Sequence, residues 1–276
     1  MNYRYIIAVT CCVLLIVICL VACAPTQSAV PQTPSVPAVT TPQTPAAQDL
    51  PKPAAVQQNR KILFQDDFKD PKSGWRVFAN DFGEGKYENG SYTLKCIRVS
   101  YPKFEVYTSN PGLMPLTSFA LDMDVTMLNG DRDDQIGILL KWPDINPNGI
   151  EGYEQPSDYY FLIGPADMSA LAYSKQEVKG SSVDKTPGYF LERKQYTCVK
   201  GVNSVNNIKI SFNPEIRFLV NDYELFKTMD ENLDYVNRLI KDNTIAGATL
   251  QVIANSGKAF ASPVFQLNKI AVYANN

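Results

Sequence analysis

Apolar and polar residues alternate through most of the chain after residue 60. From Phe119 to Met127 every odd position is apolar, and every even position except Ala120 is polar. A repeat of two is typical of a strand that is buried on one face only, as in an antiparallel sheet. We therefore expect a half-buried strand here.

Further segments are strand candidates because they are short, rich in β-branched and aromatic residues, and bounded by turn residues. They are 61–64, 91–98, 104–108, 135–142, 158–163, 168–174, 189–193, 207–212, 215–220, 224–227, 248–254 and 264–273. Between 218 and 226 the pair Asn221-Asp222 predicts a tight hairpin, since both residues tolerate positive φ. Short strands without a helical rhythm between them predict an all-β antiparallel sandwich, or jelly roll.

One segment departs from this alternation. Within Asp230–Lys241, apolar residues recur at positions 233, 236, 239 and 240, which is helical spacing, and Asp230 is a suitable N-cap. We expect one short amphipathic helix, with its apolar face packed on the sandwich.

The first residues of the chain follow another pattern. A short, positively charged start that includes Arg4 precedes an almost wholly apolar run, Tyr5–Ala22. This is the architecture of a secretory signal. As a helix the run is about 27 Å long, so an uncleaved transmembrane anchor is the alternative. Both interpretations place the rest of the chain outside the cytoplasm.

The apolar run ends in Leu20-Val21-Ala22-Cys23, which resembles the bacterial lipobox. The resemblance implies that residues 1–22 are a lipoprotein signal peptide and that Cys23 carries acyl chains such as palmitate. The mature protein would then be lipid-anchored on the extracytoplasmic side of the bacterial cell membrane. Ala24 follows the lipid site, and in a two-membrane cell this resembles lipoproteins forwarded to the outer membrane.

Residues 23–60 form a linker rich in proline, threonine and alanine. The segment contains no aromatic residue, and its only charged residues before Arg60 are Asp49 and Lys52. Such a composition cannot bury enough apolar surface to offset the entropy of ordering, so we expect disorder. Frequent proline favours extended conformations. The segment is therefore either a spacer that lifts a domain off the membrane or a linker of no specific length.

Residues 61–276 are enough for one domain with its own core. The chain has a formal net charge of −2 and shows no basic stripe, which argues against a nucleic-acid partner. It contains no histidine. Ser-His-Asp and Cys-His nucleophiles, HExxH sites and histidine metal ligands are therefore excluded.

Several motifs occur in an order that resembles a known fold family. They are Phe64–Trp75, Tyr87–Tyr92, a strand containing Gly137, the aromatic strand Asp158–Ile163, and the hairpin around Asn221-Asp222. This order is similar to the concanavalin A-like lectin/glucanase jelly rolls of bacterial surface lipoproteins, close to laminin G-like domains and the 3-keto-disaccharide hydrolase domain. The resemblance covers nearly all of 61–276 and implies a carbohydrate-related role, which in such relatives ranges from lectins to glycosidases.

Asp122 and Asp124 are the candidate catalytic residues, because glycoside hydrolysis needs two carboxyl groups about 5–9.5 Å apart. Their spacing places both side chains on one face of a strand. Jelly-roll glucanases carry a Glu-x-Asp-x-x-Glu pattern, and neither of its glutamates is present here. The alternative is that the two aspartates only keep the strand solvated.

Asp131, Asp133 and Asp134 form an oxygen-rich loop that is a candidate site for a structural Ca²⁺. The spacing matches no EF-hand, and Arg132 lies between the carboxylates. The alternative is a polar turn between two strands.

Trp142, Tyr153, Tyr159 and Tyr160 are the candidate ligand-binding residues, because sugar rings stack their CH faces on aromatic side chains. Tyr159 and Tyr160 are adjacent on a strand, so they should point to opposite faces, with one of them in the core. Packing in the core is the alternative for each of the four.

Cys96 and Cys198 are the two thiols that would remain, besides Cys23, after removal of a leader. An even pair outside the cytoplasm is a disulfide candidate. Two buried free thiols are the alternative, since small cysteines pack well in strands.

Together these features predict a membrane-anchored, extracytoplasmic binding module that recognises glycan at the cell surface or wall polymer. One alternative is a carbohydrate-active hydrolase similar to the 3-keto-disaccharide hydrolase domain. The other is a structural or protein-interaction domain without a small ligand.

Overall fold

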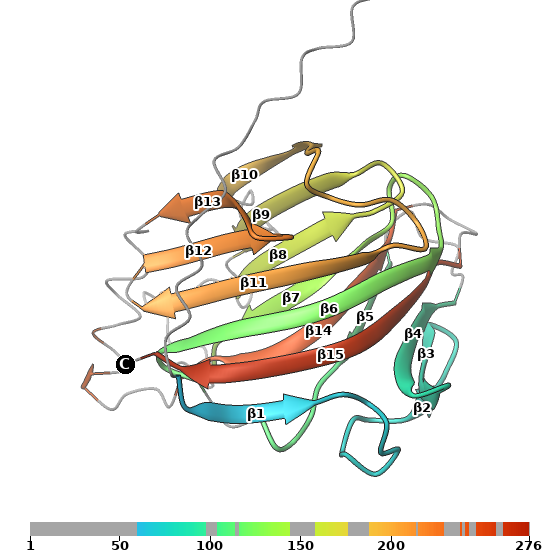
Figure 1. The fold of residues 1–276 in the computed structure, drawn as a ribbon, viewed down its shortest axis with the longest axis horizontal. Coiled ribbons are helices and arrows are strands. Elements are labelled where there is room, and N and C mark those ends of the chain that lie inside the picture. Colours follow the sequence, from blue (N-terminus) through green and yellow to red (C-terminus); the bar gives the residue numbers. More distant parts are fainter. Residues whose placement is uncertain are drawn as a thin grey trace, which may run out of the picture. The chain divides into compact units, whose positions relative to one another are not determined.

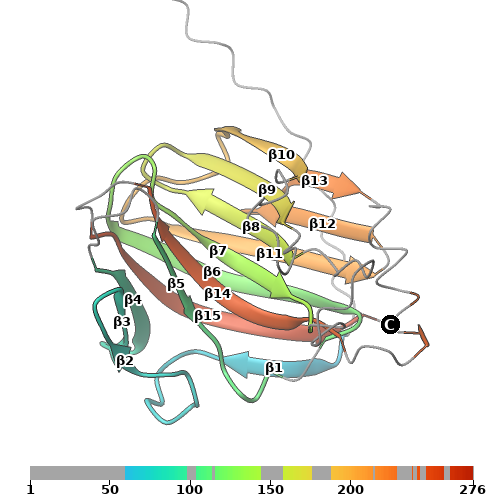
Figure 2. The same ribbon diagram turned by 180° about the vertical axis from the view of Figure 1, so that it is seen from behind.

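The computed structural model describes residues 60–97, 104–113, 116–143, 158–175, 188–213, 215–228, 238, 241–242, 247–257 and 262–275. These residues form two antiparallel sheets that pack face to face (Figure 1, Figure 2). The predicted all-β sandwich is therefore confirmed.

The larger sheet, sheet A, contains nine strands. Its order is β13 (Tyr223–Thr228), β12 (Glu215–Val220), β11 (Val205–Asn213), β6 (Phe119–Asn129), β15 (Val264–Ala274), β4 (Ser91–Cys96), β3 (Gly83–Glu88) and β2 (Phe78–Ala79), with β1 (Ile62–Asp66) also paired to β15. The first and last strands are thus joined, which ties both ends of the domain into one sheet.

The smaller sheet, sheet B, contains six strands. Its order is β10 (Gly188–Gln195), β9 (Ser169–Lys175), β8 (Asp158–Gly164), β7 (Gln135–Lys141), β14 (Thr249–Ser256) and β5 (Phe104–Thr108). We call the side of each sheet that is turned away from the other sheet its outward face.

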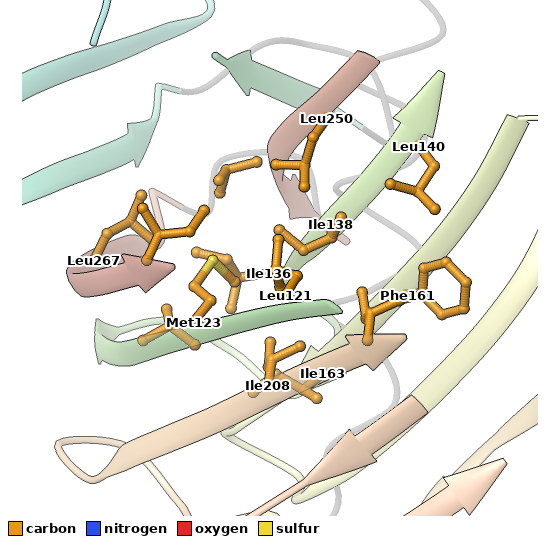
Figure 3. Close-up of a cluster of buried hydrophobic side chains, with 14 of the residues drawn as sticks. Leu121, Met123, Ile136, Ile138, Leu140, Phe161, Ile163, Ile208, Leu250 and Leu267 are labelled. Atoms are coloured by element: carbon orange, nitrogen blue, oxygen red, sulfur yellow. The ribbon is translucent and has the colours of Figure 1, made fainter. Parts of the chain in front are cut away.

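The alternation in β6 produces the expected two faces. Leu121 and Met123 are buried between the sheets, whereas Asp122 and Asp124 lie half-buried on the outward face of sheet A. Side chains from β7, β8, β11, β14 and β15 complete the core (Figure 3). Burial of these apolar side chains is the main force that holds the two sheets together.

The segment between β1 and β2 packs on the core through a buried carboxylate and aromatic rings. Asp66 accepts hydrogen bonds from the backbone N–H of Phe68 (2.7 Å) and from Nε1 of Trp75 (2.8 Å). The rings of Phe68 and Trp75 lie 5.4 Å apart, and Trp75 lies 5.9 Å from Tyr92 in β4. The opening motif of the sequence therefore has a structural role in this domain.

The edge between β10 and β13 is closed by stacked rings. Phe190 stacks on Phe226 across the two sheets, with centroids 5.7 Å apart, and on Tyr159 with centroids 5.8 Å apart. The predicted hairpin at Asn221-Asp222 is also present, with φ values of 51° and 68°. Positive φ at both central residues matches the twist of the flanking strands.

Strands β2 and β3 are the main elements that the sequence pattern missed. Gly83 and Gly85 weaken the strand signal of Gly83–Glu88. Gly85 is required for packing, because a Cβ atom at that position would lie 2.2 Å from the hydroxyl oxygen of Tyr92.

Most of the predicted helix 230–241 lies outside the described residues. Its end is partly described: residues 238 and 241 are helical, and Asp242 N–H donates to the carbonyl of Arg238 at 2.9 Å. The predicted leader 1–22 and the linker up to residue 59 also lie outside this part. In the ranges that the structure describes, no helix is long and apolar enough to cross a membrane.

Candidate functional site

Three tyrosines lie on the outward face of sheet B, and we call them the tyrosine cluster: Tyr107, Tyr160 and Tyr173. Tyr160 in β8 and Tyr173 in β9 are cross-strand partners, and their rings stack with centroids 4.5 Å apart and planes 4° from parallel. Tyr107 in β5 turns to the same face, because its neighbour Val106 is part of the core. Tyr107 is 39% exposed.

Apolar side chains pack around Tyr160 and Tyr173 on the outward face of sheet B, and we call these side chains the apolar base. Leu139, Leu162, Leu171 and Ile253 form with Tyr160 a second buried cluster that is separate from the main core. Each of these residues alternates with a core residue along its strand, so the base lies on the outward face. Apolar packing below the rings restrains their positions before any ligand arrives.

Polar side chains flank the cluster in a row across three strands. Asn255 in β14 is the register partner of both Glu105 in β5 and Gln135 in β7. The hydroxyl of Tyr107 donates a hydrogen bond to Oε2 of Glu105. The Oδ1 atom of Asn255 is buried and accepts no hydrogen bond from the described residues. The face therefore combines aromatic rings with carboxylate and amide groups.

Burial raises the pKa of Tyr107 strongly, and the hydrogen bond to Glu105 adds to the shift because it favours the neutral phenol. The proximity of Tyr160 and Tyr173 raises the pKa further. Tyr107 therefore carries its proton at neutral pH and acts as a hydrogen-bond donor.

The outward face of sheet A carries a second group of polar side chains, around Asp122 and Asp124. Nδ2 of Asn207 donates to Oδ1 of Asp122 at 2.5 Å and to Oδ1 of Asp124 at 2.7 Å. The structure thus brings the two predicted carboxylates together on one amide group. Lys209 in β11 is the cross-strand partner of Asp122, and Lys269 in β15 is that of Asp124.

An open pocket of about 490 Å³ lies beside this pair, and we call it the polar pocket. Its lining includes residues of the turn that follows β10 together with Asp124, Asn207, Lys209, Asn221, Asp222 and Tyr223. Lys209 forms an ion pair with Asp222 at 2.5 Å. Burial lowers the pKa of Lys209, but the hydrogen bond to Asp222 and the nearby carboxylates outweigh it, so the pKa is raised.

The side chain of Asn221 holds the wall of the polar pocket in place. Its Nδ2 donates to the carbonyl of Cys198 at 2.6 Å and to Oδ1 of Asn206 at 2.9 Å. Its Oδ1 accepts from the backbone N–H of Asn207 at 2.9 Å. These bonds fix the β12–β13 hairpin against the turn after β10.

The structure describes three of the four aromatic residues that were predicted to bind a ligand, and it places them in different environments. Trp142 and Tyr159 are core residues that no glycan can reach, which corrects their assignment as ligand-binding candidates: Trp142 packs on Phe212 with centroids 5.7 Å apart, and Tyr159 is fully buried. Tyr160 points to the opposite face from Tyr159, as strand geometry requires. Tyr153 lies outside the described residues.

The candidate calcium loop is held by hydrogen bonds and ion pairs. Asp134 is fully buried and accepts from the backbone N–H groups of Asp131 (2.6 Å) and Gly257 (3.0 Å). Asp133 pairs with Arg193, which also pairs with Asp167 at 2.7 Å. Within the described ranges no three acidic or cysteine side chains converge on a metal position. The carboxylates of Asp133 and Asp134 are already engaged in these bonds, as the alternative interpretation of a polar turn expects.

Cys96 and Cys198 are both buried free thiols, so the disulfide candidate is corrected. Cys96 ends β4 and its Sγ lies 3.5 Å from the carbonyl oxygen of Ala254 in β14. Cys198 lies in the turn after β10, beside Asn221. Each thiol packs among different neighbours, and burial raises the pKa of both.

The sequence pattern did not single out Glu105, Tyr107 and Tyr173 as candidate site residues. The signal was present in the strand pattern: Val106 predicts a core-facing position, so its neighbours Glu105 and Tyr107 share the outward face. The placement of Tyr107 on the same outward face as the two other tyrosines depends on strand order in sheet B, which alternation does not reveal.

No protein-family model matches the sequence, and comparison with curated proteins finds no similar sequence. Solved structures are similar in fold. The laminarinase from Rhodothermus marinus has a TM-score of 0.51 at 12% identity, covering 78% of this chain and 98% of that protein. The endo-1,3-β-glucanase from Thermotoga petrophila has a TM-score of 0.50 at 10% identity, covering 79% and 99%.

A third similar structure is the GlcNAcα1-4Gal-releasing endo-β-galactosidase from Clostridium perfringens, with a TM-score of 0.52 at 8% identity. It covers 82% of this chain and 65% of that protein. At such identities the likeness concerns the fold alone. The described domain is thus an antiparallel jelly-roll β-sandwich whose fold is similar to that of these proteins.

Proposed function

We propose that this protein is a membrane-anchored, extracytoplasmic module that binds glycan through the outward face of sheet B. The observation that carries the proposal is the tyrosine cluster, in which the exposed Tyr107 shares the outward face of sheet B with the stacked pair Tyr160 and Tyr173. The exposed ring of Tyr107 offers a flat apolar surface on which a sugar ring can stack, whereas Tyr160 is itself buried under its neighbours.

The polar groups beside the rings provide hydrogen-bond partners for sugar hydroxyls. Sugar hydroxyls both donate and accept hydrogen bonds, and sites that bind them combine a few fixed polar groups with apolar walls. Glu105 supplies carboxylate acceptors beside Tyr107. A hydroxyl-rich ligand would donate to this carboxylate and cover the ring of Tyr107 at the same time.

The fold agrees with this proposal. The three similar structures are described as a laminarinase, an endo-1,3-β-glucanase and an endo-β-galactosidase, all of which act on glycans. The same sandwich can serve different functions, so the fold supports a glycan partner without selecting one.

The anchor is the second part of the proposal. The lipobox-like sequence 20–23 supports acylation of Cys23, and residues 24–60 would hold the domain away from the bilayer. Cys23→Ser should release the protein from the membrane fraction and abolish incorporation of a radiolabelled fatty acid. Unchanged acylation in this variant would contradict the assignment.

Hydrolysis is a second candidate, because one observation favours it. Asp122 and Asp124 both lie within hydrogen-bond distance of the same Asn207 nitrogen, which is compatible with the ~5–5.5 Å separation of a retaining carboxylate pair. The pair lies on sheet A, on the opposite side of the sandwich from the tyrosine cluster.

A binding screen with product analysis distinguishes the candidates. The full-length lipoprotein in lipid nanodiscs is applied to a glycan array and to purified cell-wall polysaccharides, with empty nanodiscs as the control. We expect saturable binding to one glycan class, with the glycan recovered at its original length. Shortened products would establish the hydrolase instead. Binding to no polymer would contradict the proposal and favour a structural or protein-interaction role.

A further inference from the structure

We infer that the protein has a second saccharide site in the polar pocket of sheet A, and that this site takes a neutral, hydroxyl-rich sugar unit. The inference goes beyond the proposed function, because the pocket lies on the opposite sheet from the tyrosine cluster and shares no residue with it. Its volume of about 490 Å³ lies in the usual range for sites of small organic ligands.

The polar groups of the pocket are fixed before a ligand arrives. Nδ2 of Asn207 bonds to both Asp122 and Asp124, so the amide orientation is determined: the flipped amide would turn its oxygen toward two carboxylates. The side-chain amide of Asn221 forms three hydrogen bonds to neighbouring segments. Polar groups that are already ordered lose little entropy when they bind a ligand.

The charges at the pocket balance. Two carboxylates, Asp124 and Asp222, and two ammonium groups, Lys200 and Lys209, line it. Just outside the lining, Asp122 and Lys269 add one charge of each sign. A charged ligand would therefore meet as much repulsion as attraction, whereas a neutral ligand would not.

The remaining bonding capacity suits hydroxyl groups. A carboxylate only accepts hydrogen bonds and an ammonium group only donates them, while a hydroxyl does both. A sugar can thus donate to Asp124 and accept from Lys200 within one pocket. Tyr223 supplies the apolar part of the wall, because its side chain lines the pocket and packs against the core.

Two sites on opposite faces would let one chain hold two glycan segments at once. Linked binding events of this kind raise the overall strength of attachment without any new contact at either site. For a lipid-anchored protein, the result would be a bridge between neighbouring glycan strands.

The test counts bound sugars on the full-length protein in nanodiscs. The probes are neutral tetrasaccharides of β-glucan, mannan and galactan type, and native mass spectrometry gives the number bound per chain. For the wild type we expect two tetrasaccharide molecules bound per chain, either two of the same probe or one each of two probes. Asp124→Asn and Lys200→Ala should each weaken one of the two binding events at least tenfold, whereas Lys86→Ala, a lysine elsewhere in sheet A, should leave both unchanged.

Tyr107→Ala separates this inference from the proposed function. If Tyr107→Ala removes one unit and Asp124→Asn removes the other, both sites exist. A single bound unit that is lost only in Tyr107→Ala would overturn the second site and keep the proposed one. A single unit lost only in Asp124→Asn would do the reverse, and no bound unit for any probe would overturn both.

Discussion

The rings of Tyr160 and Tyr173 stack face to face across β8 and β9, with centroids 4.5 Å apart. The residue next to Tyr160, Tyr159, turns to the other side of the sheet and stacks on Phe190 in the core. One aromatic dipeptide thus places Tyr159 in the core between the sheets and Tyr160 on the outward face that we assign to glycan.

Asp66→Asn should destabilise the domain by about 2–3 kcal/mol, because the new amide cannot accept from both buried donors as the carboxylate does. The measurement is equilibrium unfolding in urea. Asp67→Asn is the matched control, since Asp67 is exposed and pairs with Lys69 at the surface. An equal effect of the two changes would contradict the structural role of Asp66.

Asp134→Ala should lower the free energy of unfolding by roughly 1–3 kcal/mol, because the N–H groups of Asp131 and Gly257 lose their acceptor. Calcium should not change the melting temperature of the wild-type protein, since these oxygens are already used. A calcium-dependent rise of several degrees that disappears in Asp134→Ala would show instead that the loop binds the ion.

Stability should fall in alkali. Burial raises the pKa of Tyr92 from 10.0 to about 12 and that of Cys96 from 9.0 to about 12. The folded state therefore binds protons that the unfolded state has released, so stability is complete below pH 9 and is lost between pH 9 and 12. For Tyr92 the loss is roughly 2–3 kcal/mol.

Tyr92→Phe tests this pH dependence. The variant loses the hydrogen bonds to Arg76 and Thr108, so it should be less stable at pH 7. Its stability should then fall less steeply between pH 10 and 12 than that of the wild type. Parallel curves for the two proteins would contradict the raised pKa of Tyr92.

Both Cys96 and Cys198 should react with iodoacetamide only after unfolding, and without any reductant. Both are buried, and burial raises their pKa values, so little thiolate is present or accessible in the folded state. Mass spectrometry of the two peptides measures the labelling. Failure of both to react in guanidinium, followed by reaction after reduction, would indicate a disulfide in the natural protein.

The sequence was sufficient to predict features that depend on neighbouring residues along the chain alone. The alternation in 119–127 predicted which side of β6 is buried, and Asn221-Asp222 predicted a hairpin with positive φ at both residues. Such local signals need no knowledge of strand order.

Sites that depend on strand order could not be predicted in this way. Tyr107 shares a face with Tyr160 and Tyr173 because β5, β14, β7, β8 and β9 lie in that order in sheet B. Asp122 and Asp124 were predicted to share a face, but their common partner Asn207 comes from β11, more than eighty residues later. Trp142 could not be told from a surface residue, because burial depends on the opposite sheet.

The most direct test of the central claim is the affinity of the full-length protein for the glycan found in the screen, measured by calorimetry for the wild type and three variants. Tyr107→Ala should weaken binding about tenfold or more, which is about 1.4 kcal/mol. Tyr107→Phe keeps the ring and should retain most of the affinity. Phe82→Ala changes a comparably exposed aromatic residue before β3 and should have no effect. Equal affinities of the wild type and Tyr107→Ala would contradict the assignment of glycan to this face.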